Sequence, residues 1–449
     1  MKLRPRLADH ALARRHVVDG EEVVVIHDAR DGSLCRLEPA SFALLACADG
    51  TRELEGIALA ASRAGLYTRL GEITSLLSEL EALGLLDEGV EPGPMPTERE
   101  DRVETPAPEP LASRPLEALP SYRLSCTGAG GCCKQYGSVA LSADDVSRGE
   151  RAGFARLPGD VRGERVWLPL YGAVRTERVA MTTVDGRCLQ LLDDDRCGLE
   201  ARGGHGAKPV GCRSYPATFV DDGEQVRVSV ACECDCVFES RARSGGAPLH
   251  PGRVVADLEA PLTIRRLPPQ VAVAPGTGAP RHEVAAWSRL VAGQVEKDGV
   301  LERLVALAAE LEAGRLVPWP APTALSEQRL LGPLSALADL MERAARSAEG
   351  WRSERDRTRV LRRLVADRAR TLVESADSRA AAFGDPSWCE DEALAVRATI
   401  FGHHVAGETD LASGLGALAA RLVVARALGR TAVGHPIAAV MAAMRGATG

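Results

Sequence analysis

Cysteines are the residues of this sequence with the clearest capacity for chemistry, and most of them are gathered in one segment. Of the twelve cysteines, nine fall between residues 126 and 236. A packed core has no need of so many thiols, and thiolates are soft ligands for iron, zinc and iron–sulfur clusters. We therefore predict a metal centre here. Its candidate ligands are Cys126, Cys132, Cys133, Cys188, Cys197, Cys212, Cys232, Cys234 and Cys236.

The alternative use of these thiols is a disulfide framework, which is typical of small secreted domains. The chain has 449 residues, and no apolar signal-peptide segment follows its opening MKLRPRLADH. No apolar run of about eighteen residues marks a membrane span. The net charge is −7 with both signs interspersed, which argues against nucleic acid and anionic membrane as partners. We expect a reduced, cytoplasmic, metal-binding protein.

The spacing of the first three cysteines indicates an irregular loop. Cys126, Cys132 and Cys133 belong to the stretch CTGAGGCC, in which glycines allow sharp turns that point backbone amides at sulfur. The side chains of adjacent cysteines diverge, so this pair serves one centre from a loop or faces two centres. Nine thiols suffice for one four-iron cluster plus a second metal, or for two such clusters with one thiol spare.

The later cysteines flank turns and prolines. Cys188 and Cys197 lie on either side of the turn DDDR, and Cys212 lies between Pro209 and Pro216. The last three cysteines alternate in the run ACECDC, and in an extended strand all three would point the same way. These segments therefore predict that ligands converge from several loops.

Polar residues near the cysteines have simpler explanations than metal binding. His205 could complete a site, although a loop histidine is more often exposed to solvent. His403 and His404 are expected to be structural or exposed, because neighbours on a helix point about 100° apart. Asp144 and Asp145 follow Ser142 and indicate a helix start. Three isolated cysteines are expected to be small buried hydrophobes, and these are Cys35, Cys47 and Cys389.

The chain is predicted to be a multidomain α+β protein. It divides into a small winged-helix-like module (1–90), a linker with seven prolines (91–119), an irregular cysteine-rich domain (120–245) and a mainly α-helical C-terminal domain (246–449). The linker is expected to let the first module move independently of the cysteine domain.

Patterning within these parts predicts individual elements. In the first module we expect strands at 21–28 and 33–37, a helix that starts at Pro39, a second helix over 52–64 and a third that ends before Gly84. Apolar residues at helical spacing in the C-terminal domain predict helices within 283–313, 324–348, 354–380, 390–406, 411–428 and 434–445.

The cysteine domain resembles the YkgJ-type cysteine-cluster family, described as iron–sulfur or zinc- or iron-chelating, and its relative, the flagellin lysine-N-methylase family (FliB). The matching stretches are YRLSCTGAGGCCKQYGSVALSADDV, GRCLQLLDDDRCGLE and KPVGCRSYPATF. The sequence departs from the family pattern at two places. Residues 127–131 lack the cysteine usual in the first loop, so one ligand must come from elsewhere, and Lys208 stands where the family has arginine.

The first module resembles the PqqD-like winged-helix family through its hairpin, its three helices and the phrase that runs from Leu37 to Thr51. This resemblance implies that a peptide or protein substrate pairs with an exposed strand edge. The alternative is a module that only packs or dimerises.

Three functions remain open from the sequence. The favoured one is an iron–sulfur cluster-binding protein of the YkgJ type, with one or two 4Fe-4S clusters, that acts on a peptide or protein. The first alternative is a lysine N-methyltransferase that uses S-adenosylmethionine, for which the sequence has no independent motif and no assigned catalytic residue. The second is a zinc-binding structural or peptide-recruiting module.

Overall fold

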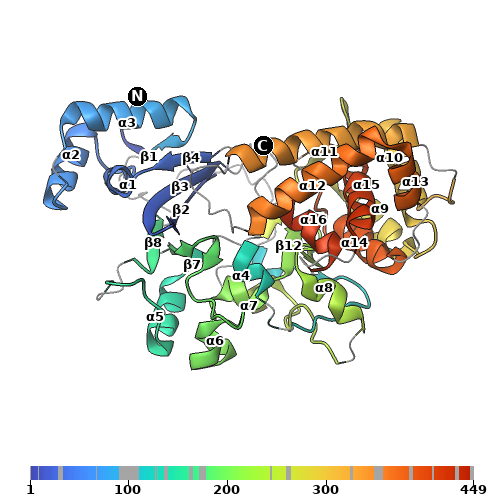
Figure 1. Cartoon of the computed structure of the whole chain (residues 1–449), viewed down its shortest axis with the longest axis horizontal. Coiled ribbons are helices and arrows are strands. Elements are labelled where there is room, and N and C mark those ends of the chain that lie inside the picture. Colours follow the sequence, from blue (N-terminus) through green and yellow to red (C-terminus); the bar gives the residue numbers. More distant parts are fainter. Residues whose placement is uncertain are drawn as a thin grey trace, which may run out of the picture.

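The computed structural model describes most of the chain as a mixed α+β protein with several small sheets and a large group of helices (Figure 1). This agrees with the predicted fold class at the level of a multidomain α+β chain. The residues that it does not describe are 1, 9, 29–33, 67, 90–110, 127, 129, 136–139, 161–164, 171–177, 243–244, 259–263, 324–326, 348–356, 384–387, 407–408, 430–433 and 445–449.

The N-terminal module is an antiparallel sheet covered by helices. Its apolar core joins Ile26 of the sheet to Phe42, Ile57 and Leu77 of the three helices. The strand predicted at 21–28 and the helix start at Pro39 are confirmed, whereas strand β2 was not expected. The elements are β1 (Pro5–Leu7), β2 (Ala11–Val18), β3 (Glu21–Asp28), β4 (Leu34–Leu37), α1 (Pro39–Ala46), α2 (Leu54–Arg63), α3 (Leu70–Ala82) and β5 (Leu86–Glu88), with β1 paired to β5.

This module shares a sheet with the cysteine domain. The strand order is β11-β10-β2-β3-β4, in which β10 (Thr183–Val184) runs parallel to β2 and β11 is Arg187–Cys188. The Asp185 amide donates to the Val17 carbonyl at 2.9 Å, and Leu168 packs into the module's core. The expectation that the two parts move independently is therefore wrong, because backbone pairing and apolar packing join them outside the linker.

A second sheet crosses the expected domain boundaries. Its order is β14-β12-β13-β6, with β12 at Ala217–Asp221 and β13 at Val226–Val230. Strand β6 (Leu116–Ala118) comes from the predicted linker and β14 (Ile264–Arg266) from the predicted helical domain. Residues 111–119 therefore belong to the folded structure, with the short 3-10 helix η1 at Leu111–Ser113.

The rest of the cysteine domain is short and irregular, as predicted. Its third sheet has the order β7-β9-β8. The elements are α4 (Gly131–Gln135), β7 (Ala140–Leu141), α5 (Ala143–Ala152), β8 (Trp167–Leu170), β9 (Arg178–Met181), α6 (Gly198–Gly203), η2 (His205–Ala207), α7 (Val210–Ser214), α8 (Asp235–Glu239), η3 (Ser240–Ala242) and η4 (Val255–Asp257).

The C-terminal part is helical after the hairpin β15–β16. Every predicted helical segment carries a helix, and two of them carry two helices each, with the first division made at the left-handed Gly299. The elements are β15 (Gln270–Ala274), β16 (Thr277–Pro280), α9 (Arg281–Gln294), α10 (Val300–Glu312), α11 (Glu327–Ser347), α12 (Arg357–Glu374), α13 (Ala376–Phe383), α14 (Cys389–Phe401), α15 (Leu411–Leu428) and α16 (Pro436–Met444).

Helix α15 is the centre of the helical core. Among the described residues it is the one helix long and apolar enough to cross a membrane, but 72% of it is buried inside the protein. Such burial is typical of the core helix of a soluble protein. In Figure 1 the helices lie at one end of the molecule, the N-terminal module lies at the other, and the cysteine domain lies below both.

Candidate metal centre

The first cysteine segment is held against α8 by polar contacts. The Tyr122 hydroxyl donates to the Val237 carbonyl at 3.0 Å, and the Ser125 amide donates to the Ser240 hydroxyl at 2.8 Å. These contacts place Cys126, which is exposed, beside Cys236, with their sulfur atoms 4.0 Å apart.

Helix α4 carries the adjacent cysteines and lies against the DDDR turn. The sulfur atoms of Cys132 and Cys133 are 3.9 Å apart. The Lys134 ammonium lies 2.7 Å from the Asp195 carboxylate. Gly130 precedes the helix with a φ of +66°, and a Cβ there would stand 2.4 Å from the Asp195 carbonyl oxygen. The predicted need for glycine in this loop thus has a physical cause, which is positive φ and close backbone approach.

Cys188 and Cys197 flank the DDDR turn, and backbone contacts hold both of them. Cys188 ends the β10–β11 hairpin, and its sulfur accepts from the Gln190 amide at 3.5 Å. Cys197 forms a β-bridge with Leu191 and immediately precedes α6. These two thiols therefore sit on a compact unit to which Lys134 ties α4.

Cys212 lies on the short helix α7, which follows Pro209. The helix is fixed by Asp145, which is buried and accepts from the Val210 amide at 3.0 Å. Asp145 also forms a reciprocal capping box with Ser142 at the start of α5. The predicted helix start is confirmed, and the same carboxylate positions the cysteine helix.

The last three cysteines do not form the extended strand that their alternation suggested. Strand β13 ends at Val230, Cys234 is the N-cap of α8, and Cys236 lies in its first turn. Cys232 precedes this turn, and all three cysteines are buried. Because the helix breaks the period of two, the three thiols are not presented on one strand face.

The thiols influence one another's ionisation. A hydrogen bond with Cys133, helped by the nearby Lys208 charge, lowers the pKa of Cys132 to about 7, while the same bond and burial raise the pKa of Cys133. The bond with Cys236 raises the pKa values of Cys126 and Cys234. Cys132 is therefore the thiol best suited to be a thiolate near neutral pH.

Two further thiols, Cys188 and Cys212, are held in the protonated form near neutral pH. Burial raises the pKa of Cys188 to about 12, with Cys197 and Cys132 adding to the shift. Burial, together with the charges of Cys188, Cys132 and Cys197, also raises the pKa of Cys212. Metal binding here would release protons, because a metal ligand must be a thiolate.

Lys208 is a residue whose role sequence reasoning missed. Burial lowers the pKa of its ammonium group, but an ion pair with Glu200 at 3.1 Å and the nearby Cys197 and Cys126 raise it above the usual value. Its only sequence signals are its position four residues before Cys212 and its match to the family's arginine. It places a positive charge beside a group of thiols.

The histidines expected to be exposed or structural have partners other than the clustered thiols in the described structure. His205 is exposed and hydrogen-bonds Glu200 at 3.1 Å. His403 is buried and His404 half-buried, and each contacts a hydroxyl group, Ser288 and Thr218 respectively. The isolated cysteines were expected to be buried but are only half-buried, and partial burial raises the pKa of each of them, namely Cys35, Cys47 and Cys389.

The thiols are not gathered tightly around one point. Within the described ranges, no three or more histidine, cysteine, aspartate or glutamate side chains are placed to hold a single metal ion. A zinc ion requires all its sulfur ligands at about 2.3 Å. A four-iron cluster places each thiolate on a different iron, so its ligands stand further apart.

No protein-family model matches this chain, and no curated protein or solved structure matches it either. The resemblances suggested by its motifs stay predictions.

Proposed function

We propose that this chain is an iron–sulfur cluster-binding protein. The observation that carries the proposal is the convergence of cysteines from five separate segments on one region. Eight of them each interact, through sulfur contact or charge, with at least one other thiol of the set. These eight are Cys126, Cys132, Cys133, Cys188, Cys197, Cys212, Cys234 and Cys236.

The donor set fits such a cluster better than a single ion. The candidate ligands are all soft thiols, no three of them are placed for a single ion in the described part of the chain, and the positive charge of Lys208 lies beside them. Thiolate ligation of iron and sulfide needs these properties. A bound cluster would supply electron transfer or structural cross-linking, and the chain's own residues would set its solvent access and charge environment.

The test is metal and acid-labile sulfide analysis of the full chain purified without oxygen, with a visible spectrum. We expect roughly four iron and four sulfide per cluster. The Cys389→Ser variant, which changes a cysteine remote from the set, should keep the wild-type content. Zinc without sulfide would refute the proposal and favour a structural zinc module.

The sheet of the N-terminal module ends in an edge strand. In the described part of its sheet, β4 stands at the end of the strand order and pairs with β3 alone. An edge strand with an unpaired side is the surface that peptide strand addition uses. We propose this edge as the place where a peptide or protein substrate binds, as the PqqD-like resemblance implies.

A further inference from the structure

The helix that carries Cys236 is too short to hold its own shape. Helix α8 has five residues (Asp235–Glu239), with Cys234 as its N-cap. A helix of little more than one turn forms few internal hydrogen bonds for the conformational entropy it costs, so it depends on tertiary contacts. The positions of Cys234 and Cys236 are therefore set by the segments that pack against α8.

The segment that leads to Cys126 makes the first of these contacts. The Tyr122 hydroxyl donates to the Val237 carbonyl of α8 at 3.0 Å. Beside this contact, the sulfur atoms of Cys126 and Cys236 lie 4.0 Å apart. Because the two thiols come from separate segments, a displacement of α8 would move one away from the other.

The start of α16 makes the second contact with α8. The ring of His435 stacks on the ring of Phe238, with ring centres 4.1 Å apart and ring planes inclined by 6°. The His435 amide also donates to Oδ1 of Asp235 at 3.0 Å. Gly434 approaches the same carboxylate so closely that a Cβ there would lie 2.8 Å from Oδ2. The segment that leads into α16 thus contacts α8 at its first residue and near its last.

Residues at the start of α14 fix the imidazole ring. Nε2 of His435 lies 3.1 Å from Oδ2 of Asp391, and Nε2 is the donor because a carboxylate accepts hydrogen bonds. The Trp388 ring meets the imidazole at 87°, with ring centres 5.3 Å apart. Oδ1 of Asp391 also pairs with Nε of Arg241 at 2.9 Å. Asp391 therefore links α14 both to the start of α16 and to the segment that follows α8.

The imidazole is enclosed by these neighbours. The His435 side chain is 13% exposed, and its Nδ1 atom is buried without a hydrogen-bond partner in the described part of the chain. The ring is thus held by one hydrogen bond and by packing between two aromatic side chains. In a closely packed interior such a ring transmits position, because its neighbours leave it little freedom to move.

We propose that His435 is a positioning residue for the metal centre, which holds α8 in the place where Cys236 meets Cys126. This inference rests on the proposed cluster-binding function and adds to it the residue through which the C-terminal helices act on the ligand set. None of the contacts around His435 involves a metal, so the positioning exists before metal binds. Loosening the start of α16 should therefore separate the two thiols.

The test measures how close Cys126 and Cys236 lie in the metal-free full chain. Dibromobimane joins two thiols that lie close together, and peptide mass spectrometry identifies the joined pair. His435→Ala should reduce the Cys126–Cys236 cross-link severalfold, because α8 loses its stacking partner. His435→Phe keeps a flat ring on Phe238 and should restore most of the cross-link.

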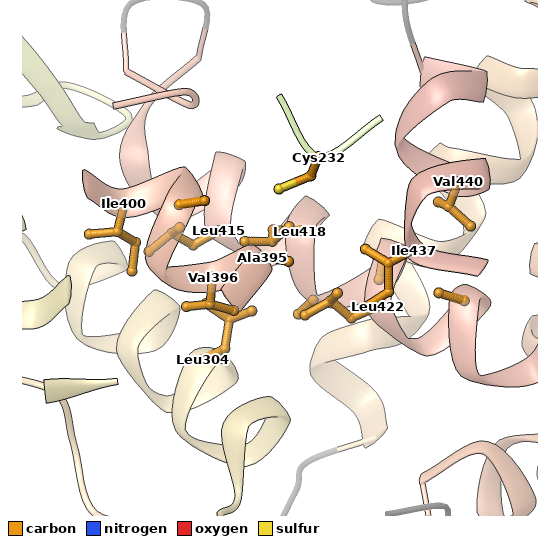
Figure 2. Packing of buried hydrophobic residues seen from close by; sticks show 14 of the residues in the cluster. Cys232, Leu304, Ala395, Val396, Ile400, Leu415, Leu418, Leu422, Ile437 and Val440 are labelled. Carbon is orange, nitrogen blue, oxygen red and sulfur yellow. The ribbon is translucent and has the colours of Figure 1, made fainter. Parts of the chain in front are cut away.

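Two controls separate positioning from loss of stability. The cross-link between Cys132 and Cys133, whose sulfur atoms lie 3.9 Å apart, should form equally in all variants. Val440→Ala shortens a buried side chain of α16 within the helical core, where Figure 2 shows it. This variant should melt at a lower temperature and should leave the Cys126–Cys236 cross-link unchanged.

Circular dichroism checks that each variant is folded. If His435→Ala does not fold, Asp391→Ala takes its place, because it leaves the ring without its hydrogen bond, and the same cross-link should fall by a smaller factor. An unchanged cross-link in the folded variant would overturn the proposal. An equal loss in Val440→Ala, or a His435→Phe variant that restores nothing, would overturn it as well.

The outcome for the proposed function is read separately. Protein that binds zinc without sulfide, or no metal, refutes the cluster function, while the cross-link is measured without metal and still decides the role of His435. In protein that holds a cluster, His435→Ala should release iron to EDTA faster than the wild type and Val440→Ala. Release at the wild-type rate from His435→Ala would keep the cluster function and overturn the positioning role.

Discussion

The ammonium nitrogen of Lys208 lies 3.1 Å from Oε2 of Glu200, and this ion pair stands beside four of the clustered thiols. Lys208 acts through charge on Cys126, Cys132, Cys197 and Cys212. Its side chain is only 16% exposed, so solvent screens this charge less than it would at the surface.

Replacement of Lys208 should therefore lower the reduction potential of a bound cluster. The positive charge favours the more negative reduced state, so Lys208→Gln should shift the midpoint potential downward by tens of millivolts, on the order of 1 kcal/mol. Glu200→Gln should shift it upward. A redox titration followed by visible absorption measures both shifts. Lys297→Gln, at an exposed ion pair with Glu390, is the control, and a Lys208 shift no larger than this control would contradict the charge effect.

Removal of either cysteine of the adjacent pair should reduce metal content and stability together. Cluster binding and folding are coupled, because the thiols form their site only in the folded chain. Cys132→Ser and Cys133→Ser should each bind less iron than the wild type and should melt at a lower temperature. Iron analysis and thermal unfolding measure the two effects. Full iron content and an unchanged melting temperature in both variants would show that the ligand assignment is wrong.

Acid should destabilise the junction between the sheet of β13 and the helices. Burial lowers the pKa of His403 to about 3 and that of His404 to about 4. Below about pH 6.5 the unfolded chain binds protons that the folded chain does not, so stability falls as pH falls from 6.5 toward 4. The expected loss from His403 alone is about 2 kcal/mol at pH 5.

This pH effect can be isolated by substitution. His403 has a φ of +50°, a conformation that asparagine tolerates, so His403→Asn combined with His404→Gln retains the backbone. Urea unfolding at several pH values should show a flatter dependence in the double variant than in the wild type. Equal slopes between pH 6.5 and 4.5 would count against the two histidines as its source.

The buried arginine of β13 should matter far more than an exposed arginine of the same sheet. Arg227 is fully buried, donates to Asp222 at 2.8 Å and lies 4.8 Å from the ring centre of Phe401. Arg227→Met leaves the Asp222 carboxylate buried without this partner and should cost about 3 kcal/mol.

The matched control is Arg266→Met. Arg266 is 55% exposed and pairs with Asp221 at 2.9 Å, so its loss should cost about 1 kcal/mol or less. The midpoint of urea unfolding measures both changes. Similar midpoints for the two variants would mean that the buried pair does not stabilise the contact between sheet and helices.

Local signals in the sequence predicted local structure well. The helix over 411–428 and the strand over 21–28 have the predicted bounds, because apolar spacing and β-branched residues act within each segment. The Ser142 cap was also predictable, since its partner Asp145 is three residues away. The crowding of cysteines in the chain predicted that they would lie near one another, and eight of the nine interact with another thiol of the set.

Features that depend on distant partners could not be predicted in this way. Strand β2 contains Arg14, Arg15 and His16, which obscure its apolar pattern, and β10 is only two residues long. The alternation in the ACECDC run predicts an extended strand, but in the folded chain its last two residues lie in α8. The position of α4 against the DDDR turn depends on the long-range contact of Lys134 with Asp195, which no spacing rule contains.

Because β10 pairs with β2, the N-terminal module and the cysteine domain do not depend on their covalent connection alone to stay together. Backbone hydrogen bonds and the packing of Leu168 already join the two parts. Loop-closure entropy grows slowly with length. The two parts should therefore reassemble when supplied as separate polypeptides, and a substrate held by one part would keep a constant orientation toward the other.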